Sequence, residues 1–341
     1  MNVYKFKLFI IRVLKLAVPK GLYSFYFRKH VIINKNMAYN KINYDELQKK
    51  FNFKQIYLSD DILGMGFYSY TETAIPENIF WNRHNAFIPI HFYGHRNIGK
   101  TIGNPFKKYA IIVETESIDP VPYHRLLRRE KLALSYDAIF THSKEILDKY
   151  ENAYFIPAGG IWYKNPVSFE NRFEELIELK NKGVSIVSSN KNMSSLHKYR
   201  IKLSEYCKTK GIADTFGNFD GGNIVSIDGT LTKYRYSIVI ENTIAPYCFT
   251  EKILNCFASY TVPIYLGASD IGKFFNKDGI IILDANLSFD EIERIINNCN
   301  LDDYKNRLVA IHENFIISQK FACQEDFIMK NYGNMFNQGK Q

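Results

Sequence analysis

The feature that most constrains the fold is a stretch of 32 residues in which two apolar strands flank a helix. It reads YSIVIENTIAPYCFTEKILNCFASYTVPIYLG, from Tyr236 to Gly267. The first strand ends in Glu241 and Asn242, a helix begins near Thr250, and a second apolar strand follows. Strands that alternate with helices are typical of α/β domains. The stretch therefore predicts part of a doubly wound α/β sheet.

The same alternation recurs along the chain. The expected strands lie at 54–58, 86–93, 109–113 and 136–143, then at 184–190, 213–218, 235–242, 262–267 and 279–283. The expected helices include 122–134, with Leu126, Leu127, Leu132 and Leu134 facing inward, 169–183, ending in Gly183, 197–211, closed by Gly211, and 288–298. In the last of these, Ser288 and Glu291 have the spacing of a capping box.

The length of the chain indicates more than one domain. With 341 residues it exceeds the usual size of a single hydrophobic core. The two blocks of strands and helices predict an N-terminal α/β domain at 45–170 and a C-terminal α/β domain at 171–341. A basic arm at 1–44 precedes them.

The net charge of +9 is concentrated in that arm. Residues 1–44 contain nine Lys and Arg and no acidic residue, so the remainder carries 35 basic and 35 acidic residues. The arm interleaves Leu, Ile and Phe with cations, which suits an anionic membrane surface. Its uncharged runs are too short to span a bilayer. We expect residues 1–35 to bind a membrane surface, with a basic helix packed on the protein itself as the alternative. The neutral remainder argues against nucleic acid as a partner.

The five cysteines indicate neither a disulfide framework nor a zinc site. They are odd in number and far apart, and none has CxxC spacing. With no signal peptide, because charges interrupt any apolar leader segment, this pattern predicts reduced thiols in a cytoplasmic protein.

Polar residues follow several strands of the second block, where open α/β sheets bind ligands. Ser189, Asn190 and Lys191 follow one strand, and Glu241 and Asn242 follow another. A helix then begins with a set of three residues, Thr250, Glu251 and Lys252. We expect these side chains to meet at one sheet edge.

Lys252 is unusual because it lies in the first turn of its helix. A cation there opposes the helix dipole at a cost of about 0.3–1 kcal/mol, so it needs a neutralising partner or a bound anion. Arg200, in another helix of the same block, is a second cation near this edge. Together the two cations suit a diphosphate. Each residue alone is also compatible with ordinary surface charge.

The stretch from Tyr236 to Gly267 resembles the signature of the α-1,3-fucosyltransferase family (glycosyltransferase family 10). That signature is a strand ending in Glu-Asn, then a helix opened by Thr-Glu-Lys, then Val-Pro and a glycine. The segments SSNKN with Arg200, DTFG, ETESIDP and FIPAGGIW resemble further family blocks in the family's order. The resemblance covers roughly residues 110–285.

The resemblance implies a fold, a donor and site residues. The fold would be GT-B, in which two Rossmann-like doubly wound domains face a cleft. A GDP-sugar would bind the C-terminal domain as co-substrate, with no metal or other cofactor. Arg200 and Lys252 would hold the diphosphate and Glu251 the ribose, while Glu241 and Asn242 shape the pocket. Family members commonly have a tyrosine that contacts the donor at the position of Cys248. Here Tyr247 is shifted from it by one residue and would be the corresponding donor-site residue.

Inverting glycosyl transfer requires a base for the acceptor hydroxyl and fixed positive charge for the leaving diphosphate. Glu114 and Glu116 end a buried strand of the first block. We expect Glu116 to be the base, since it corresponds to the family's proposed base, with Glu114 as the alternative. Glu116 could instead cap the helix near Pro122. His124 and His142 are interpreted as acceptor-site or structural residues.

The function implied is transfer of fucose from GDP-fucose to a hydroxyl of a cell-surface glycan or lipopolysaccharide precursor, at the inner face of the cell membrane. Two alternatives stay open. The same fold could use a different nucleotide sugar, because Cys248 departs from the family pattern, or the protein could bind a nucleotide sugar without activity. The acceptor is not indicated by the sequence.

Overall fold

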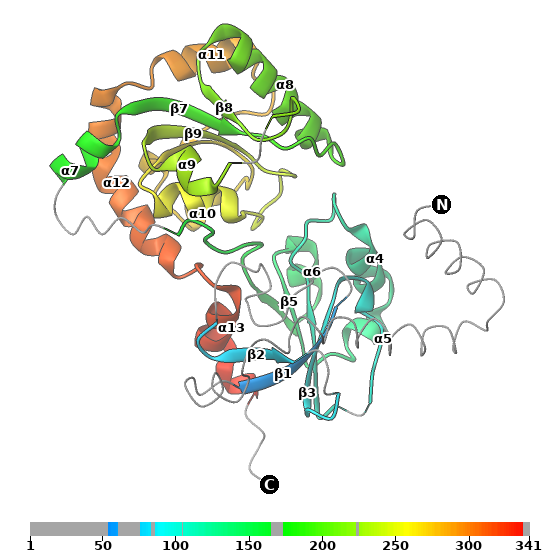
Figure 1. Ribbon diagram of the computed structural model, residues 1–341. Helices are drawn as coiled ribbons and strands as arrows, with labels where there is room; N and C mark the ends of the chain where they lie inside the picture. The colour runs from blue at the N-terminus through cyan, green and yellow to red at the C-terminus, as the bar shows by residue number, and fades with distance from the viewer. Residues whose placement is uncertain are drawn as a thin grey trace, which may run out of the picture. The chain divides into compact units, whose positions relative to one another are not determined.

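Two parallel sheets organise the chain in the computed structural model (Figure 1). The structure describes residues 54–60, 76–82, 86–103, 105–164, 173–222 and 225–336. These residues fall in one compact unit, Lys54–Gln341. The predicted arm at 1–44 lies outside the described residues. So does the predicted domain boundary at 170/171, which stays a prediction.

The first sheet has the strand order β2-β1-β3-β4-β5-β6, and all its pairings are parallel. Its strands are β1 Lys54–Ser59, β2 Ile79–Asn82, β3 Ile90–Gly94, β4 Lys107–Ile111, β5 Ala138–Thr141 and β6 Ala153–Phe155. The accompanying helices are the 3-10 helix η1 His95–Asn97, α4 Pro120–Arg128, α5 Glu130–Ala133 and α6 Lys144–Lys149.

Alternating side chains of these strands divide between two core layers, as the period of two in a strand requires. Phe92 and Phe140 pack on one face of the sheet with Phe336 from the end of the chain. Their neighbours Tyr93 and Ile139 pack on the other face, against α4 and α6. Both faces are therefore covered, which is the usual state of a parallel sheet.

The second sheet has the order β11-β10-β9-β7-β8 and is also parallel. Its strands are β7 Lys182–Val187, β8 Asp214–Phe216, β9 Tyr234–Ile240, β10 Val262–Leu266 and β11 Ile281–Ile282. The helices in this part are α7 Phe173–Leu179, α8 Ser195–Lys210, α9 Ile227–Leu231, α10 Glu251–Ala258, α11 Phe289–Asn297 and α12 Leu301–Gln319, with 3-10 helices η2 Ile271–Lys273 and η3 Lys277–Gly279. The α/β class with two parallel sheets was predicted correctly.

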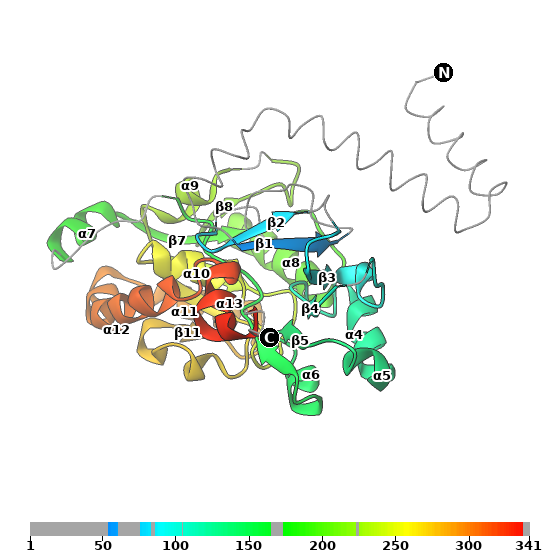
Figure 2. The same ribbon diagram turned by 90° about the horizontal axis from the view of Figure 1, so that it is seen from below.

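The last elements, α13 Gln324–Tyr332 and η4 Gly333–Phe336, return to the first sheet. Figures 1 and 2 both show α13 beside β2 and β1. The buried indole of Trp81 in β2 donates to Glu325 Oε1 over 2.7 Å, and Tyr109 in β4 donates to the carbonyl of Met335 over 2.7 Å. The last helical elements of the chain thus complete the hydrophobic core of the first sheet.

Several helix predictions are confirmed by their end groups. Ser288 and Glu291 form the predicted capping box of α11, and Thr250 is the N-cap of α10. Gly211 ends α8 with a φ of 67°, a left-handed conformation that glycine adopts without penalty.

Two helix predictions are wrong in detail. The predicted helix 122–134 breaks at Arg129 into α4 and α5, and Leu134 is exposed rather than inward. The helix predicted at 169–183 ends before Gly183, which lies inside β7. The contacts of Lys180 explain why this helix ends before Gly183. Its fully buried Nζ donates to the carbonyls of Leu231 and Tyr234, so the chain turns into the sheet at this point.

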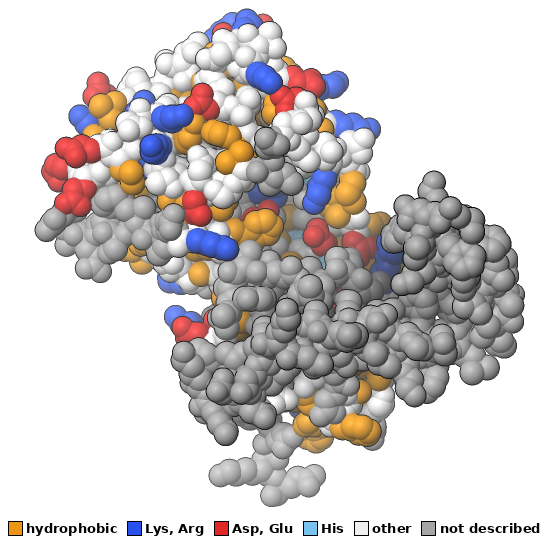
Figure 3. Space-filling view, in the orientation of Figure 1, with side chains coloured by type: hydrophobic (Ala, Val, Ile, Leu, Met, Phe, Trp, Pro, Cys, Tyr) orange, Lys and Arg blue, Asp and Glu red, His pale blue; other side chains and the backbone are white. Residues whose placement is uncertain are grey.

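Charges of both signs mix on the surface of the part that carries the second sheet (Figure 3). Among the described residues, no helix combines the length and apolar character needed to cross a bilayer.

Candidate functional site

The site is built where β7 and β9 end side by side. The two strands pair in parallel, with Val184 opposite Tyr236, so their carboxyl ends reach the same edge of the sheet. Ser189 follows β7 at this edge, and Glu241 and Asn242 follow β9. The predicted meeting of these polar residues at one edge is therefore observed.

Glu241 joins the end of β9 to the start of α10. Its carboxylate accepts from the backbone N–H of Thr250 over 3.0 Å and from the Thr250 hydroxyl, with Oε2 at 2.8 Å. Thr250 in turn caps α10 by accepting from the N–H of Lys252. Glu241 is fully buried, so this carboxylate would be costly without such donors.

Lys252 supplies the opposite charge. Its Nζ donates to Glu241 Oε2 over 3.1 Å, to Thr250 Oγ1 over 2.9 Å and to Glu251 Oε1 over 3.2 Å. Burial alone would lower the pKa of Lys252, but the attraction of Glu241 and then of Glu251 outweighs it and raises the pKa. The neutralising partner required at this helix start is therefore present within the chain.

The pKa of Glu251 shifts in the opposite direction to that of Lys252. Burial alone would raise the pKa of its carboxyl, but the charge of Lys252 and hydrogen bonds to the ionised form hold that pKa below its ordinary value. The cluster therefore contains two carboxylates and one ammonium group at the first turn of α10.

Arg200 brings a second cation to the cluster from α8. It is 5% exposed, and its Nη1 donates to the carbonyl of Ile240 over 2.9 Å. Its buried Nε–H has no hydrogen-bond partner among the described residues. Burial lowers the pKa of Arg200, although Glu241 and Glu251 act against that shift. An unpaired guanidinium N–H of this kind is available to an anionic ligand.

A cavity of about 490 Å³ opens over this cluster, which is a typical size for a small-molecule site. The lining from the second half of the chain includes Ser189, Lys191, Met193, His197, Arg200, Ile227, Leu231, Asn242, Thr250, Glu251, Lys252 and Asn255. The lining from the first half includes His95, Val113, Glu114, Thr115, Ile118, Ala158 and Trp162. Residues around both sheets thus contribute to one cavity.

Three predicted donor-site residues lie outside this lining. Glu241 is buried beneath it and acts through Thr250 and Lys252. Asn190 is exposed, and its N–H donates to Asn218 Oδ1. Tyr247 has a φ of 62° and donates its N–H to Asp270.

The two candidate bases have different surroundings. Glu114 lines the cavity. Glu116 is about half exposed, with Oε1 3.6 Å from His124 Nε2. The alternative that Glu116 caps a helix is wrong, because Asp119 caps α4 by accepting from the N–H of Val121.

The two histidines considered from the sequence differ in environment. His124 is half exposed beside Glu116. His142 is buried, and its Nε2 lies 3.1 Å from the hydroxyl of Tyr123. Burial lowers the pKa of His142 to about 4, which suits a neutral structural residue.

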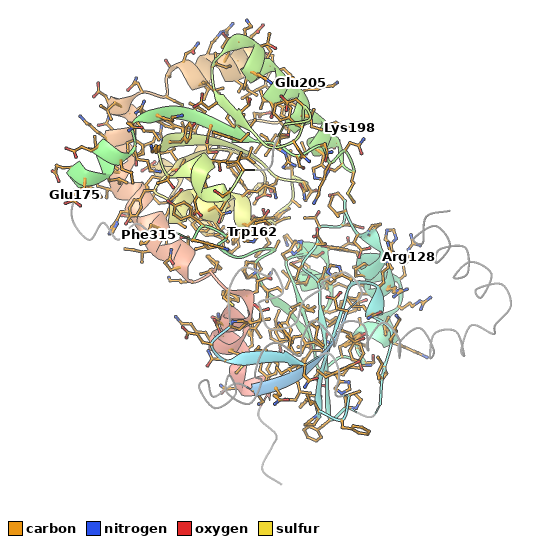
Figure 4. All side chains as sticks on the ribbon, viewed as in Figure 1. Arg128, Trp162, Glu175, Lys198, Glu205 and Phe315 are labelled. Atoms are coloured by element: carbon orange, nitrogen blue, oxygen red, sulfur yellow. The ribbon has the colours of Figure 1, made fainter. Side chains whose placement is uncertain are left out.

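Sequence reasoning missed several residues of the lining. His95 follows β3 with a φ of 46°, and its Nδ1 lies 3.3 Å from Asp119 Oδ2. His197 forms a capping box with Ser194 at the start of α8. A signal for His95 was its place directly after a predicted strand, at the ligand-binding edge. Trp162 lies in the segment FIPAGGIW, near α10 (Figure 4).

All five cysteines lie among the described residues, and none forms a disulfide. Cys248 is buried, and burial raises the pKa of its thiol. Within the described ranges, no group of three or more His, Cys, Asp or Glu side chains is arranged to hold a metal ion.

Part of this chain is similar to known proteins. Residues 177–328 match the family model described as glycosyltransferase family 10 (fucosyltransferase) C-term. An alpha-(1,3)-fucosyltransferase of Helicobacter pylori is 29% identical over 118 residues, which make up 35% of this chain and 24% of that protein. The matched part thus spans about a quarter of the relative's length.

A solved structure of an α1,3-fucosyltransferase with GDP-fucose has a TM-score of 0.50 and 17% identity to this chain. The alignment covers 76% of this chain and 81% of that one. This likeness concerns the fold, and it confirms the predicted GT-B architecture of two Rossmann-like parts.

Proposed function

We propose that this chain, whose residues 177–328 match the C-terminal model of glycosyltransferase family 10, is an inverting fucosyltransferase. It would transfer fucose from GDP-fucose to a hydroxyl of a cell-surface glycan or lipopolysaccharide precursor. The observation that carries the proposal is the pair of cations, Arg200 and Lys252, that line one cavity at the start of α10.

The cluster supports binding of a diphosphate. Arg200 offers a buried N–H that has no partner among the described residues, and the first turn of α10 offers backbone N–H groups and a favourable dipole. Lys252 is held by Glu241 and Glu251, so a phosphate would compete with these carboxylates for its ammonium group. Release of Glu251 from Lys252 would make its carboxylate available to the ribose hydroxyls.

The base is proposed to come from the pair Glu114 and Glu116. Glu114 is favoured by its place in the cavity lining, and Glu116 is the alternative suggested by the family resemblance. The base would take the proton of the acceptor hydroxyl as that oxygen attacks the anomeric carbon. The bond to the diphosphate breaks on the other face of the sugar, and its growing charge meets Arg200 and Lys252.

The mechanism is proposed to need no metal, because fixed cations stabilise the leaving diphosphate. Transfer should therefore continue after the protein is treated with EDTA. The measurement is release of GDP before and after chelation. Loss of activity that is restored by added Mn²⁺ or Mg²⁺ would overturn this part of the proposal.

The donor is tested by a thermal-shift screen of nucleotide sugars, followed by a donor-hydrolysis assay. A ligand at 100 times its dissociation constant stabilises a protein by roughly 2.7 kcal/mol, which gives a clear shift. We expect GDP-fucose to stabilise most. A stronger response to another nucleotide sugar would support the alternative donor that Cys248 leaves open. Binding without hydrolysis or transfer would support an inactive nucleotide-sugar-binding protein.

The location is proposed from the arm. Residues 1–35 combine cations with apolar side chains, and we propose that they hold the enzyme at the inner face of the cell membrane. A membrane-bound acceptor precursor would then be within reach of the cavity.

A further inference from the structure

Trp162 lines the cavity and is 40% exposed, which is unusual for so large an apolar side chain. The mechanism proposed above gives it no role. Such an aromatic surface at the wall of a cavity is suited to stacking against a flat ring.

The segment that carries Trp162 is fixed on α10. The backbone N–H groups of Trp162 and Tyr163 both donate to Asn255 Oδ1, over 2.7 Å and 2.9 Å. Asn255 is buried within α10, so these two bonds hold the segment against the helix. The backbone of Trp162 is therefore held by the same helix that carries Glu251 and Lys252.

Gly159 brings the same segment close to the charged cluster. A Cβ atom at this position would lie 2.6 Å from the backbone nitrogen of Glu251, so only glycine permits the approach. The segment thus runs along α10 from Glu251 to Asn255, which are four residues apart and lie on one face of the helix.

The character of the cavity changes along this path. Arg200, Glu251 and Lys252 form the charged region at the start of α10. One helical turn further on, the lining includes Asn255 and Trp162, and α9 contributes the apolar residues Ile227 and Leu231. A nucleoside diphosphate has the same order of parts: a charged diphosphate, a ribose with hydroxyls, and a flat aromatic base.

We infer that Trp162 is the stacking platform for the nucleobase of the nucleotide sugar. The inference rests on the proposed function, since it assumes a nucleoside diphosphate at the cations of α10. The fixed backbone of Trp162 lowers the ordering cost of the contact. Trp162 would therefore contribute to affinity for the nucleoside part of the donor and not for its diphosphate.

The test compares GDP with inorganic pyrophosphate, which has the diphosphate but no base. We expect Trp162→Ala to weaken GDP binding by about 5- to 150-fold, the range for one base on one aromatic side chain. Pyrophosphate should bind the variant as it binds the wild type, in titration calorimetry or by competition. Ile316→Ala, an exposed apolar position on α12, serves as the matched control and should change neither affinity.

Intrinsic fluorescence gives an independent measurement, because the chain has two tryptophans. The other one, Trp81, is 2% exposed and bonded to Glu325. We expect GDP to change the fluorescence of the wild type and not that of Trp162→Phe, which retains an aromatic ring and most of the affinity.

Two results would overturn the inference alone: unchanged GDP affinity in Trp162→Ala, or equal losses for GDP and pyrophosphate. The second would mean that the residue supports the fold of the site or contacts the diphosphate. Failure of the wild type to bind GDP or any other nucleoside diphosphate would instead overturn the proposed function, and the inference with it.

Discussion

At the scale of the residue, Lys252 carries a positive charge at an unfavourable place in its helix, and neighbouring oxygen atoms compensate for this charge. Lys252 lies in the first turn of α10, where a cation opposes the helix dipole at a cost of about 0.3–1 kcal/mol. Three oxygen atoms, from Glu241, Thr250 and Glu251, surround its ammonium group within 3.2 Å. The charge is thus compensated within the fold and at the same time presented to the cavity.

We predict that Lys252→Ala weakens GDP binding and slows turnover together, because the charge that Lys252 meets grows as the glycosidic bond breaks. The loss of affinity should be on the order of 10- to 100-fold, since hydrogen bonds to charged groups contribute about 1.5–3 kcal/mol. Binding is measured by calorimetry and turnover by GDP release.

The substitution also removes the cationic partner of the buried Glu241, so the unfolding free energy must be measured alongside. Lys252→Arg keeps the charge and should keep most of the affinity. Lys198→Ala, at an exposed position of α8, is the control and should bind as the wild type does. Normal GDP binding by folded Lys252→Ala would show that the lysine is only a structural charge.

The candidate bases allow a second prediction at this scale. Glu114→Gln should cut transfer by on the order of 10² to 10⁴ while leaving GDP affinity nearly unchanged, because a base acts on the acceptor. Glu116→Gln is the matched comparison, and its effect on transfer should be smaller. The reverse order of effects, measured as GDP release in the presence of acceptor, would assign the base to Glu116.

At the scale of elements, the carboxyl edge of the second sheet depends on a close backbone contact. Gly217 follows β8 with a φ of 97°, and a Cβ there would lie 2.1 Å from the carbonyl oxygen of Ser188. Ser188 precedes Ser189, which lines the cavity. Packing beside the site therefore requires the glycine of the DTFG segment, Gly217.

We predict that Gly217→Ala lowers the free energy of unfolding by more than about 2 kcal/mol, because both the backbone angle and the contact must change. Gly183→Ala in β7 is the control, since nothing lies within 4 Å of its added Cβ. The control should stay within about 0.5 kcal/mol of the wild type. Chemical denaturation measures the free energy of unfolding of both variants. Equal values for Gly217→Ala and Gly183→Ala would show that the backbone at this sheet edge can move to accommodate a Cβ atom.

At the scale of the whole molecule, the order of the elements in space differs from their order along the chain. The C-terminal helix α13 and η4 pack on the first sheet through Ile328 and Phe336, although they follow the second sheet in sequence.

We predict that deletion of residues 1–35 moves the protein from the membrane fraction to the soluble fraction while donor hydrolysis persists. The reason is that the whole excess of positive charge lies in the arm. The control is a full-length variant in which Lys5, Lys7, Lys15 and Lys20 are changed to Gln. Its membrane-bound fraction should lie between those of the wild type and the truncated protein. Unchanged membrane binding of the truncated protein would contradict the prediction.

The sequence by itself determined the local features of this protein. Apolar runs such as Tyr236–Ile240 predicted buried strands, and the end groups Thr250, Gly211 and Ser288 predicted helix boundaries. The order of strands and helices predicted that Ser189 and Asn242 would meet at one edge. These features follow from the sequence because each depends on residues within one or two turns, or on the regular direction of parallel strands.

Only the tertiary structure decided which distant residues share the cavity and which charges pair. His95 and Trp162 entered the lining, Tyr247 was left outside it, and Glu241 was buried as the partner of Lys252. The packing of α13 on the first sheet was equally invisible in the sequence. These contacts join residues that belong to different elements or follow them, so they depend on how whole elements pack and not on any periodic pattern within one element.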